Sequence, residues 1–294
     1  MDRLSLISHL VEGFAVAVAP LIADEPISLV DFPDHTNVGD SAIWAGETRF
    51  LHRALRRRTS YVCTHKTYDA DALKKCAPNG PILIHGGGNF GDVWPKHQAF
   101  RYRVLRDFPD RPIIQLPQSI HYSSAEAADE TRHAISAHGR VHLLVRDQPS
   151  YDLAKSRFSC PVTLCPDAAF FLGPLKKTTP PLIDVLKVMR TDHESVVHAS
   201  DLTEYPIEDW IEEHPSVQRR AKIAGMLGGG VCGIGNPMLQ LIARYDALAQ
   251  ARVARGVRQL SRARVVITDR LHVHILCVLL GIPHVALDNS YGKI

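Results

Sequence analysis

The feature that most constrains the fold of this chain is a repeated alternation of short β-rich runs with helical stretches. In the first half, β-rich runs lie at residues 27–32, 60–65, 81–85, 112–116 and 141–145, and helical patterns lie between them. Neighbouring parallel strands need a long crossover connection, which is usually a helix. The sequence therefore predicts an α/β fold with a parallel sheet and helices on both of its faces.

The second half repeats this alternation less regularly. Strands are expected at residues 186–189, 196–199, 265–268 and 284–287, and helices at residues 207–213, 217–227, 239–261 and 271–280. Between the two halves, residues 161–181 are rich in proline. A proline-rich stretch of this kind is typical of a linker between domains.

The length of 294 residues suits two domains, because domains usually contain about 100–200 residues. We predict two doubly wound, Rossmann-like domains, one over residues 1–174 and one over residues 175–294, with a ligand site in the cleft between them. The chain stops soon after its last expected strand, where a closing helix would follow. We therefore expect the C-terminal domain to be cut short and the native chain to extend past Ile294.

Charge and cysteine content exclude several classes of protein. The 34 basic and 31 acidic residues leave a net charge of +3, which is too balanced to indicate binding to nucleic acid or to a membrane surface. The six cysteines form no C-x-x-C pair, so we expect neither a zinc site nor a disulfide framework. A reducing, cytoplasmic location fits this pattern best.

The N-terminal stretch from Leu4 to Ala19 is apolar, but His9 and Glu12 interrupt it. It makes a poor secretory signal, and its uninterrupted apolar run is shorter than the roughly 20 residues that span a bilayer. We expect an amphipathic leading helix.

The first motif with chemical potential is Asn37-Val38-Gly39-Asp40, which lies between the first expected strand and a helix expected at residues 41–57. Asn and Gly suit a turn, and Asp40 can cap the helix, so one interpretation is purely structural. The other interpretation is a ligand-binding loop, because open parallel sheets bind ligands at the carboxyl ends of their strands.

The second motif, His85-Gly86-Gly87-Gly88-Asn89-Phe90-Gly91-Asp92, also follows a buried type of strand. Its glycines allow a close approach between backbone and ligand, but the spacing matches neither of the common nucleotide phosphate loops. Asn89 and Asp92 are suited to hydrogen bonds with sugar hydroxyls. A structural, glycine-rich loop is the alternative.

The third motif is Thr268-Asp269-Arg270-Leu271-His272-Val273-His274, where a strand leads into a helix. Arg270 would lie at the helix N-terminus, whose free N–H groups already favour an anion, and His272 would lie close enough to share the ligand. This combination is typical of a phosphate or carboxylate site. In the structural alternative, Asp269 caps the helix, Arg270 is solvated and His272 packs in the core.

Six motifs, in this order along the chain, resemble those of the polysaccharide pyruvyl transferases. They read N-V-G-D-S-A-I-W, I-H-G-G-G-N-F-G-D, L-P-Q-S-I, V-R-D-Q-P-S, C-P-D-A-A-F and T-D-R-L-H-V-H, and they extend from Asn37 to His274. Each motif is modestly specific, whereas six in the family's order make a strong resemblance over nearly the whole chain.

The resemblance implies a glycosyltransferase-B-like fold, in which two Rossmann-like domains face a cleft. The donor would be phosphoenolpyruvate, and neither a cofactor nor a metal would be needed. The acceptor would be sugar hydroxyls of an exopolysaccharide repeat unit, and the product would be a pyruvate ketal. A lipid-linked acceptor would bring the enzyme to a membrane surface, and no nucleic acid is expected as a partner.

The resemblance also implies roles for individual residues. The C-terminal domain would lie on the donor side, and the donor would be bound by Arg146, Arg270, Leu271 and His272. The glycine-rich loops of the N-terminal domain would face the acceptor, which points to Asn37, Asp40, His85, Asn89 and Asp92. Arg270 and His272 are the predicted catalytic residues. Arg270 would neutralise the charge of the donor, and His272 would transfer the proton, because an imidazole can act as acid and base near neutral pH.

Two other functions stay open at this point. A glycosyltransferase of the same fold would use Arg270 to hold the diphosphate of a nucleotide-sugar donor. A non-catalytic protein that binds sugars or anions would use the same residues but release no phosphate.

Overall fold

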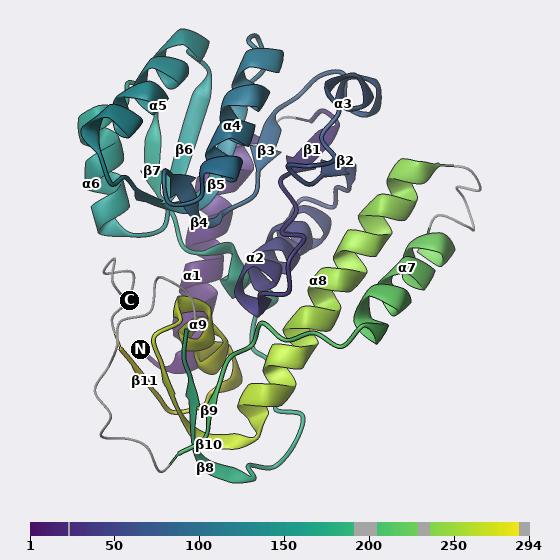
Figure 1. Ribbon diagram of the computed structural model, residues 1–294, viewed down its shortest axis with the longest axis vertical. Helices are drawn as coiled ribbons and strands as arrows, with labels where there is room; N and C mark the ends of the chain where they lie inside the picture. Colours follow the sequence, from purple (N-terminus) through teal and green to yellow (C-terminus); the bar gives the residue numbers. More distant parts are fainter. Residues whose placement is uncertain (23, 191–204, 229–235, 288–294) are drawn as a thin grey trace.

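The structure is a computed structural model that describes residues 1–22, 24–190, 205–228 and 236–287, and it contains two parallel sheets (Figure 1). The larger sheet consists of β1 (Ile27–Val30), β2 (Thr59–Cys63), β3 (Ile82–Ile84), β4 (Gly87–Gly91), β5 (Ile113–His121), β6 (Val141–Val145) and β7 (Val162–Leu164). The smaller sheet consists of β8 (Ile183–Val188), β9 (Ile207–Glu208), β10 (Ala263–Thr268) and β11 (His284–Ala286). All strand pairs in the described residues are parallel, which confirms the predicted α/β class.

Helices connect most of these strands. They are α1 (Arg3–Val18), α2 (Val38–Arg49), α3 (Ala70–Cys76), α4 (Pro95–Asp107), α5 (Ala125–His138), α6 (Gln148–Arg157), α7 (Ser216–Gly228), α8 (Pro237–Ser261) and α9 (Leu271–Leu280), with short turns η1 (Ala19–Leu21), η2 (Phe50–Ala54) and η3 (Ala168–Leu172). Figure 1 shows α4, α5 and α6 around the larger sheet, whereas the long α8 runs from the smaller sheet past α2, with α7 at its side.

The central strands β1, β3 and β5 of the larger sheet are buried on both faces, as expected for parallel strands that are covered by helices on each side. Alternate residues belong to different hydrophobic clusters because side chains of a strand point alternately to opposite faces. Ile84 and Leu143 pack in a cluster with α4, α5 and α6. Leu83 and Leu144, their neighbours, pack in a cluster that includes α1, α2, α8 and α9.

Each sheet has a point where its strand order changes direction. The order is β2-β1-β3-β5-β6-β7 in the larger sheet, where β4 pairs with β5, and β11-β10-β8-β9 in the smaller sheet. The direction changes between β1 and β3 and between β8 and β10, and ligands bind in the crevice that forms at the carboxyl ends of strands at such a point. Asp31 and His85 directly follow β1 and β3, and Arg190 and Arg270 follow β8 and β10 within two residues.

Helix α8 joins the two sheets. Trp44 of α2 donates a hydrogen bond from Nε1 to Asp246 Oδ1 of α8 over 3.2 Å, and Phe32 stacks on Tyr245 with 4.0 Å between ring centroids. One continuous hydrophobic cluster therefore includes residues from both sheets. The domain boundary expected between residues 174 and 175 falls between β7 and β8, and it stays a prediction.

Several expectations about local structure are wrong. Residues 207–213, expected as a helix, begin with strand β9, and the linker expected at residues 161–181 contains η3. The last short strand of the first half, expected at Val162 to Leu164, is confirmed as β7. The glycine-rich motif is not a simple loop, since it contains β4. Gly91 in that strand has a φ of 114°, and a Cβ there would lie 1.7 Å from the carbonyl oxygen of His121, so no other residue fits. The strand expected at residues 196–199 lies outside the described residues.

Helix α1 is the leading helix expected from the sequence. Ile7, Phe14 and Val18 are buried on one of its faces, and Arg3 donates a hydrogen bond to the carbonyl oxygen of Leu279 at the end of α9. In the described part of the chain, the segment Arg3–Leu21, with a mean hydropathy of 1.7, is long and apolar enough to cross a membrane by length and composition alone. The expectation that this stretch is too short is therefore wrong, but its buried face packs in the core. The cytoplasmic location stays a prediction.

Asp246 makes the stability of the fold depend on pH. Burial raises the pKa of its carboxyl from 3.8 to about 6. Between these values the folded state holds a proton that the unfolded chain has lost, so stability falls as the pH rises from about 4 to about 6.

We expect Asp246→Asn to stabilise the protein at pH 7.5, because it keeps an oxygen acceptor for Trp44 and removes the buried charge. The free energy of unfolding should rise by about 1–3 kcal/mol, since one pKa unit corresponds to about 1.4 kcal/mol. Urea unfolding at pH 7.5 and at pH 4 measures the effect. The gain should vanish at pH 4, and an equal gain at both pH values would contradict the assignment.

Candidate functional site

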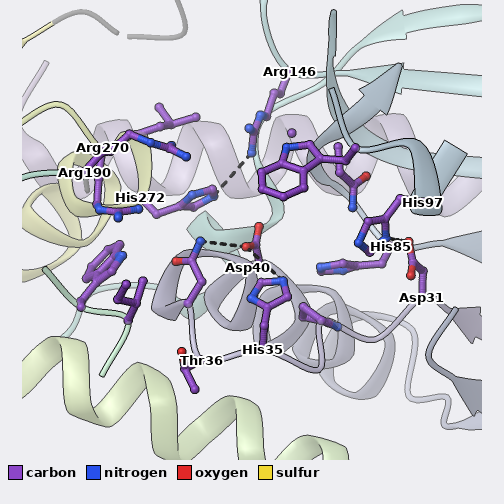
Figure 2. A pocket seen from close by; sticks show the side chains of 18 residues that line it. Asp31, His35, Thr36, Asp40, His85, His97, Arg146, Arg190, Arg270 and His272 are labelled. Atoms are coloured by element: carbon purple, nitrogen blue, oxygen red, sulfur yellow. Dashed lines mark hydrogen bonds and ion pairs between the residues drawn. The ribbon is translucent and has the colours of Figure 1, made fainter. Parts of the chain in front are cut away.

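One cavity opens where the carboxyl ends of the two sheets meet (Figure 2). Its volume is about 390 Å³, which lies in the usual range of roughly 300–1,000 Å³ for small-molecule sites. We call Arg146, Arg190, Arg270 and His272 the cationic end of the cavity, and Asp31, His85 and His97 its histidine end. Asp40 and His35 lie between the two ends. Asn37 is hydrogen-bonded to Asp40, and the remaining lining residues include Asn89, Trp94, Trp210, Ile211 and Leu271.

Arg270 is buried at the start of α9. Its Nη2 lies 2.7 Å from each carboxylate oxygen of Asp209, and its side chain is only 4% exposed. Among the described residues, its buried Nε has no hydrogen-bond partner. A buried donor without a partner costs about 1–3 kcal/mol, so Nε is available to an acceptor that a ligand brings. The solvated Arg270 of the structural alternative is therefore wrong.

The carboxylate of Asp167 joins Arg146 to His272. Arg146 donates from Nη1 to Asp167 Oδ2 over 2.7 Å and from Nε to Ser119 Oγ over 2.9 Å. His272 Nε2 lies 3.4 Å from the same carboxylate oxygen and 3.5 Å from Arg146 Nη1. Burial disfavours the charged carboxylate, but the charges and hydrogen bonds of His272 and Arg146 outweigh it and hold the pKa of Asp167 far below its usual range. The imidazole of His272 therefore lies beside both a carboxylate and a guanidinium.

The start of α9 adds to the cationic end. Within the described residues, no side chain caps this helix, and Leu271 in its first position lines the cavity. Asp269, which was expected as a cap, instead accepts a hydrogen bond from the backbone N–H of Arg190. The first turn of a helix carries a partial positive charge and free N–H groups, so this end of the cavity favours an anion.

The middle of the cavity is formed by the start of α2. Asn37, not Asp40, is the N-cap, since its Oδ1 accepts from Gly39 N over 2.9 Å, and the helix begins three residues before the expected position. Asn37 also donates from Nδ2 to Asp40 Oδ2 over 2.9 Å. Burial disfavours the charged form of Asp40, but the nearby charges, of which His35 is the largest, lower its pKa. A Cβ on Gly39 would lie 2.7 Å from His272 Nδ1, so glycine allows α2 and α9 to meet here.

His85 is paired with a buried carboxylate. Its Nδ1 lies 2.7 Å from Glu47 Oε2, and the other oxygen of Glu47 accepts from Gly86 N over 2.8 Å. Burial lowers the pKa of His85, whereas the charge and the hydrogen bond of Glu47 raise it, and the net shift is upward. The Nε2 atom of His85 is buried, and it has no hydrogen-bond partner in the described structure.

Asn89 and Asp92 have different surroundings. Asn89 lines the cavity, where its Oδ1 accepts hydrogen bonds from Gln118 and Arg101. Asp92 is not among the lining residues, and its carboxylate accepts hydrogen bonds from the backbone N–H and hydroxyl of Ser123. The structure does not bring Asp92 to the cavity, because Gly91 pairs with β5 and turns the next residue toward Ser123.

The other residues proposed from the sequence all line the cavity. Two carboxylates that do not line the cavity were not identified from the sequence. Glu47 pairs with His85, and Asp167 pairs with Arg146 and faces His272. Glu47 lies seven residues after Asp40 and therefore on the same face of α2, which is a signal that could have been read. Asp167 belongs to the C-P-D-A-A-F motif. Asp209 precedes α7 and had no comparable signal.

Comparisons with known proteins identify the family of this chain. The family model described as "Polysaccharide pyruvyl transferase" matches residues 37–291. "Pyruvyl transferase 1" of Schizosaccharomyces pombe is 37% identical over 91% of this chain and 67% of its own length. "Putative pyruvyl transferase EpsO" of Bacillus subtilis is 34% identical over 91% of this chain and 82% of its own length.

A solved structure supports the fold alone. The crystal structure of a functionally uncharacterized protein from Klebsiella pneumoniae is similar, with a TM-score of 0.57 and 18% sequence identity, over 100% of this chain and 92% of that one. Since the family model covers most of the chain and the two relatives agree with it over 91% of its length, the chain belongs to the polysaccharide pyruvyl transferase family and is a pyruvyl transferase.

Proposed function

We propose that this enzyme transfers the enolpyruvyl group of phosphoenolpyruvate to sugar hydroxyls of an exopolysaccharide repeat unit, with release of phosphate. The observation that carries the proposal is the cationic end of the cavity, where three arginines and His272 gather at the start of α9. Phosphoenolpyruvate bears both a phosphate and a carboxylate, and such a ligand needs several fixed cations and N–H donors.

The partners of the arginines support donor binding. Asp167 and Asp209 pair with Arg146 and Arg270, and neither carboxylate is among the lining residues. Each pair offsets the cost of burying a guanidinium and fixes its orientation before the donor arrives. The unpaired Nε of Arg270 would then donate to an oxygen of the donor.

The reaction requires a proton donor and a proton acceptor. Two sugar hydroxyl oxygens bond to C2 of the donor, the bond from C2 to the phosphate oxygen breaks, and C3 gains one proton to become a methyl group. The two hydroxyl protons balance this change, one for C3 and one for the departing phosphate. His272 would protonate C3, and Arg270 with the start of α9 would stabilise the charge of the phosphate.

His85 would take the proton from the sugar hydroxyl. Glu47 holds its Nδ1, and this leaves Nε2 as the atom that can accept a proton. The two histidines would therefore work at opposite ends of the cavity, His272 on the donor and His85 on the acceptor. Asn37, Asp40 and Asn89 would bind further hydroxyls of the sugar, and the description of the family supports a polysaccharide acceptor.

The architecture proposed for this chemistry is glycosyltransferase-B-like, with domains at residues 1–174 and 175–294. The two parallel sheets support this arrangement, because residues that follow the strands where each strand order changes direction line one cavity. The first domain would supply the histidine end and Arg146, and the second would supply Arg190, Arg270 and His272. An acceptor that is linked to a lipid would bring the enzyme to a membrane surface.

The function is tested by phosphate release from phosphoenolpyruvate, with and without saccharides that have neighbouring free hydroxyls. We expect release only when both substrates are present, together with a saccharide product that contains pyruvate by mass spectrometry. Nucleoside diphosphates should not inhibit. Inhibition by them, with no effect of phosphoenolpyruvate, would instead indicate a nucleotide-sugar glycosyltransferase, and binding without phosphate release would indicate a non-catalytic protein.

Replacement of His272 separates donor binding from proton transfer. We expect His272→Ala to lower kcat by roughly 10²–10⁴-fold, the usual contribution of a general acid, while the Kd for phosphoenolpyruvate changes little. His274→Gln is a matched control in the same helix, because that ring hydrogen-bonds His284 and does not line the cavity. Normal turnover by His272→Ala would show that another group donates the proton.

Glu47→Gln tests the role of His85. The amide keeps the size of the side chain and an acceptor for Gly86 N but removes the charge that raises the pKa of His85. We expect kcat/KM to fall, and the acidic limb of its pH profile to move to lower pH, because a base with a lower pKa stays deprotonated in more acidic solution. A lower rate with an unshifted acidic limb would assign Glu47 a structural role only.

A further inference from the structure

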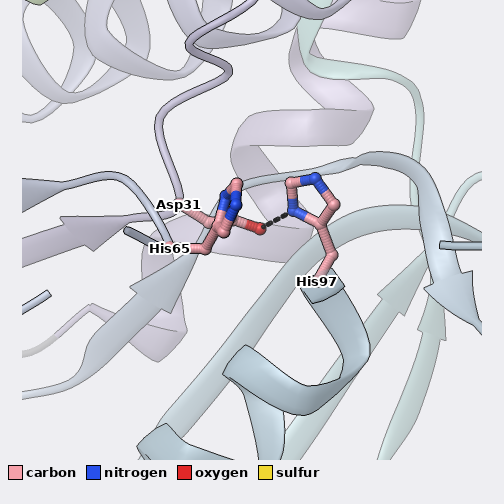
Figure 3. Close-up of side chains that lie close together, drawn as sticks. All are labelled: Asp31, His65 and His97. Atoms are coloured by element: carbon pink, nitrogen blue, oxygen red, sulfur yellow. Dashed lines mark hydrogen bonds and ion pairs between the residues drawn. The ribbon is translucent and has the colours of Figure 1, made fainter. Parts of the chain in front are cut away.

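Asp31, His65 and His97 come together at the histidine end of the cavity (Figure 3). Asp31 follows β1, His65 follows β2, and His97 lies in the first turn of α4. Their potential ligand atoms, one oxygen and two ring nitrogens, all lie within 4.8 Å of one another. The three residues are far apart in the sequence, so no motif indicates this cluster.

The carboxylate of Asp31 is incompletely paired. Its Oδ2 lies 2.8 Å from His97 Nδ1, which makes one hydrogen bond. Its Oδ1 is buried, and no group in the described residues makes a hydrogen bond to it. The nearest candidate, His65 Nδ1, is 3.8 Å away, which is too far for a hydrogen bond. The side chain of Asp31 is 0% exposed, so water at the surface does not satisfy this oxygen.

We propose that Asp31, His65 and His97 bind a divalent transition-metal cation at the edge of the cavity. Two imidazole nitrogens and one carboxylate oxygen are a donor set for Zn²⁺ and related cations, whereas Mg²⁺ and Ca²⁺ prefer oxygen ligands alone. The 2.8 Å between His97 Nδ1 and Asp31 Oδ2 is shorter than the roughly 3.4 Å between adjacent ligands of a tetrahedral cation with bonds of about 2.1 Å, so binding would move these two atoms apart by about 0.6 Å. His65 Nδ1, which lies 3.8 Å from Asp31 Oδ1, would complete the set of three ligands.

The surroundings give the cation a route to the site and open coordination positions. The side chains of His65 and His97 are 22% and 16% exposed, and Asp31 and His97 line the cavity. Three protein ligands leave at least one position of a tetrahedral cation open, as in catalytic zinc sites. Binding at His97 Nδ1 would displace the proton between His97 and Asp31, and Nε2 of the same ring can carry it.

Asp31 and His97 line the same cavity as His85, so the open position would face that end of it. A cation there would bind a sugar hydroxyl and lower its pKa, so that His85 could remove the proton more easily. This role of the cation rests on the proposed function, whereas the existence of the site does not.

Titration of the metal-stripped full chain with Zn²⁺ by calorimetry, and with Co²⁺ by absorption spectroscopy, tests the site directly. We expect one cation per chain and d–d bands of Co²⁺ bound to nitrogen and oxygen. Asp31→Asn, His65→Gln and His97→Gln should each weaken binding by at least about 10–100-fold, the effect known for lesser changes around metal ligands. His284→Gln, which breaks the other close pair of histidine rings, should not change it.

Two results would overturn the site. One is the absence of stoichiometric binding by the wild-type chain, and the other is binding that survives all three ligand substitutions or disappears in His284→Gln. Circular dichroism checks that each variant is folded. His65→Gln is the most informative variant if Asp31→Asn fails to fold, since His65 lies at the exposed edge of the cluster.

A second experiment separates the site from its role. A saccharide acceptor should change the Co²⁺ spectrum, and removal of the metal should slow phosphate release. Binding of Co²⁺ without either effect would overturn the role in binding hydroxyls and leave both the site and the proposed function intact. Failure of the proposed function would instead appear as no phosphate release by the metal-loaded enzyme with any acceptor.

Discussion

The site depends on the buried carboxylate of Asp167. This residue follows β7 of the larger sheet, pairs with Arg146 after β6, and faces His272 of α9, which follows the smaller sheet. A buried charge is costly unless other groups compensate it, and here the carboxylate lies between a guanidinium and an imidazole from distant parts of the chain. The same carboxylate links residues that follow the two sheets and orients the imidazole that we assign to proton transfer.

The cavity divides its charges between two ends. At the cationic end, Arg146 and Arg270 are anchored by carboxylates that do not line the cavity, so their charge is held in place for a ligand. At the histidine end, His85 and His97 are paired with Glu47 and Asp31. In the proposed function, this pairing would let one cavity hold an anionic donor at one end and activate the hydroxyls of a neutral acceptor at the other.

The sequence predicts the alternation of strands and helices well because apolar periodicity is a local signal, and the helix at residues 271–280 has the expected bounds. It predicts the edge of the sheet at which polar residues gather, because parallel strands end at the same side. It does not predict β4, because glycine has a low strand propensity. Gly91 is required here by its close contact with the carbonyl oxygen of His121. Glu47, Asp209 and the cluster of Asp31, His65 and His97 depend on contacts between distant segments, which no local pattern contains.

We infer that the cationic end binds a small donor with two anionic groups. A crystal structure of the enzyme with phosphoenolpyruvate would show this binding. We expect the phosphate and the carboxylate within hydrogen-bond distance of Arg146, Arg270 and the first N–H groups of α9, with C3 of the donor facing the ring of His272. Phosphoenolpyruvate bound at the histidine end, or outside the cavity, would contradict it.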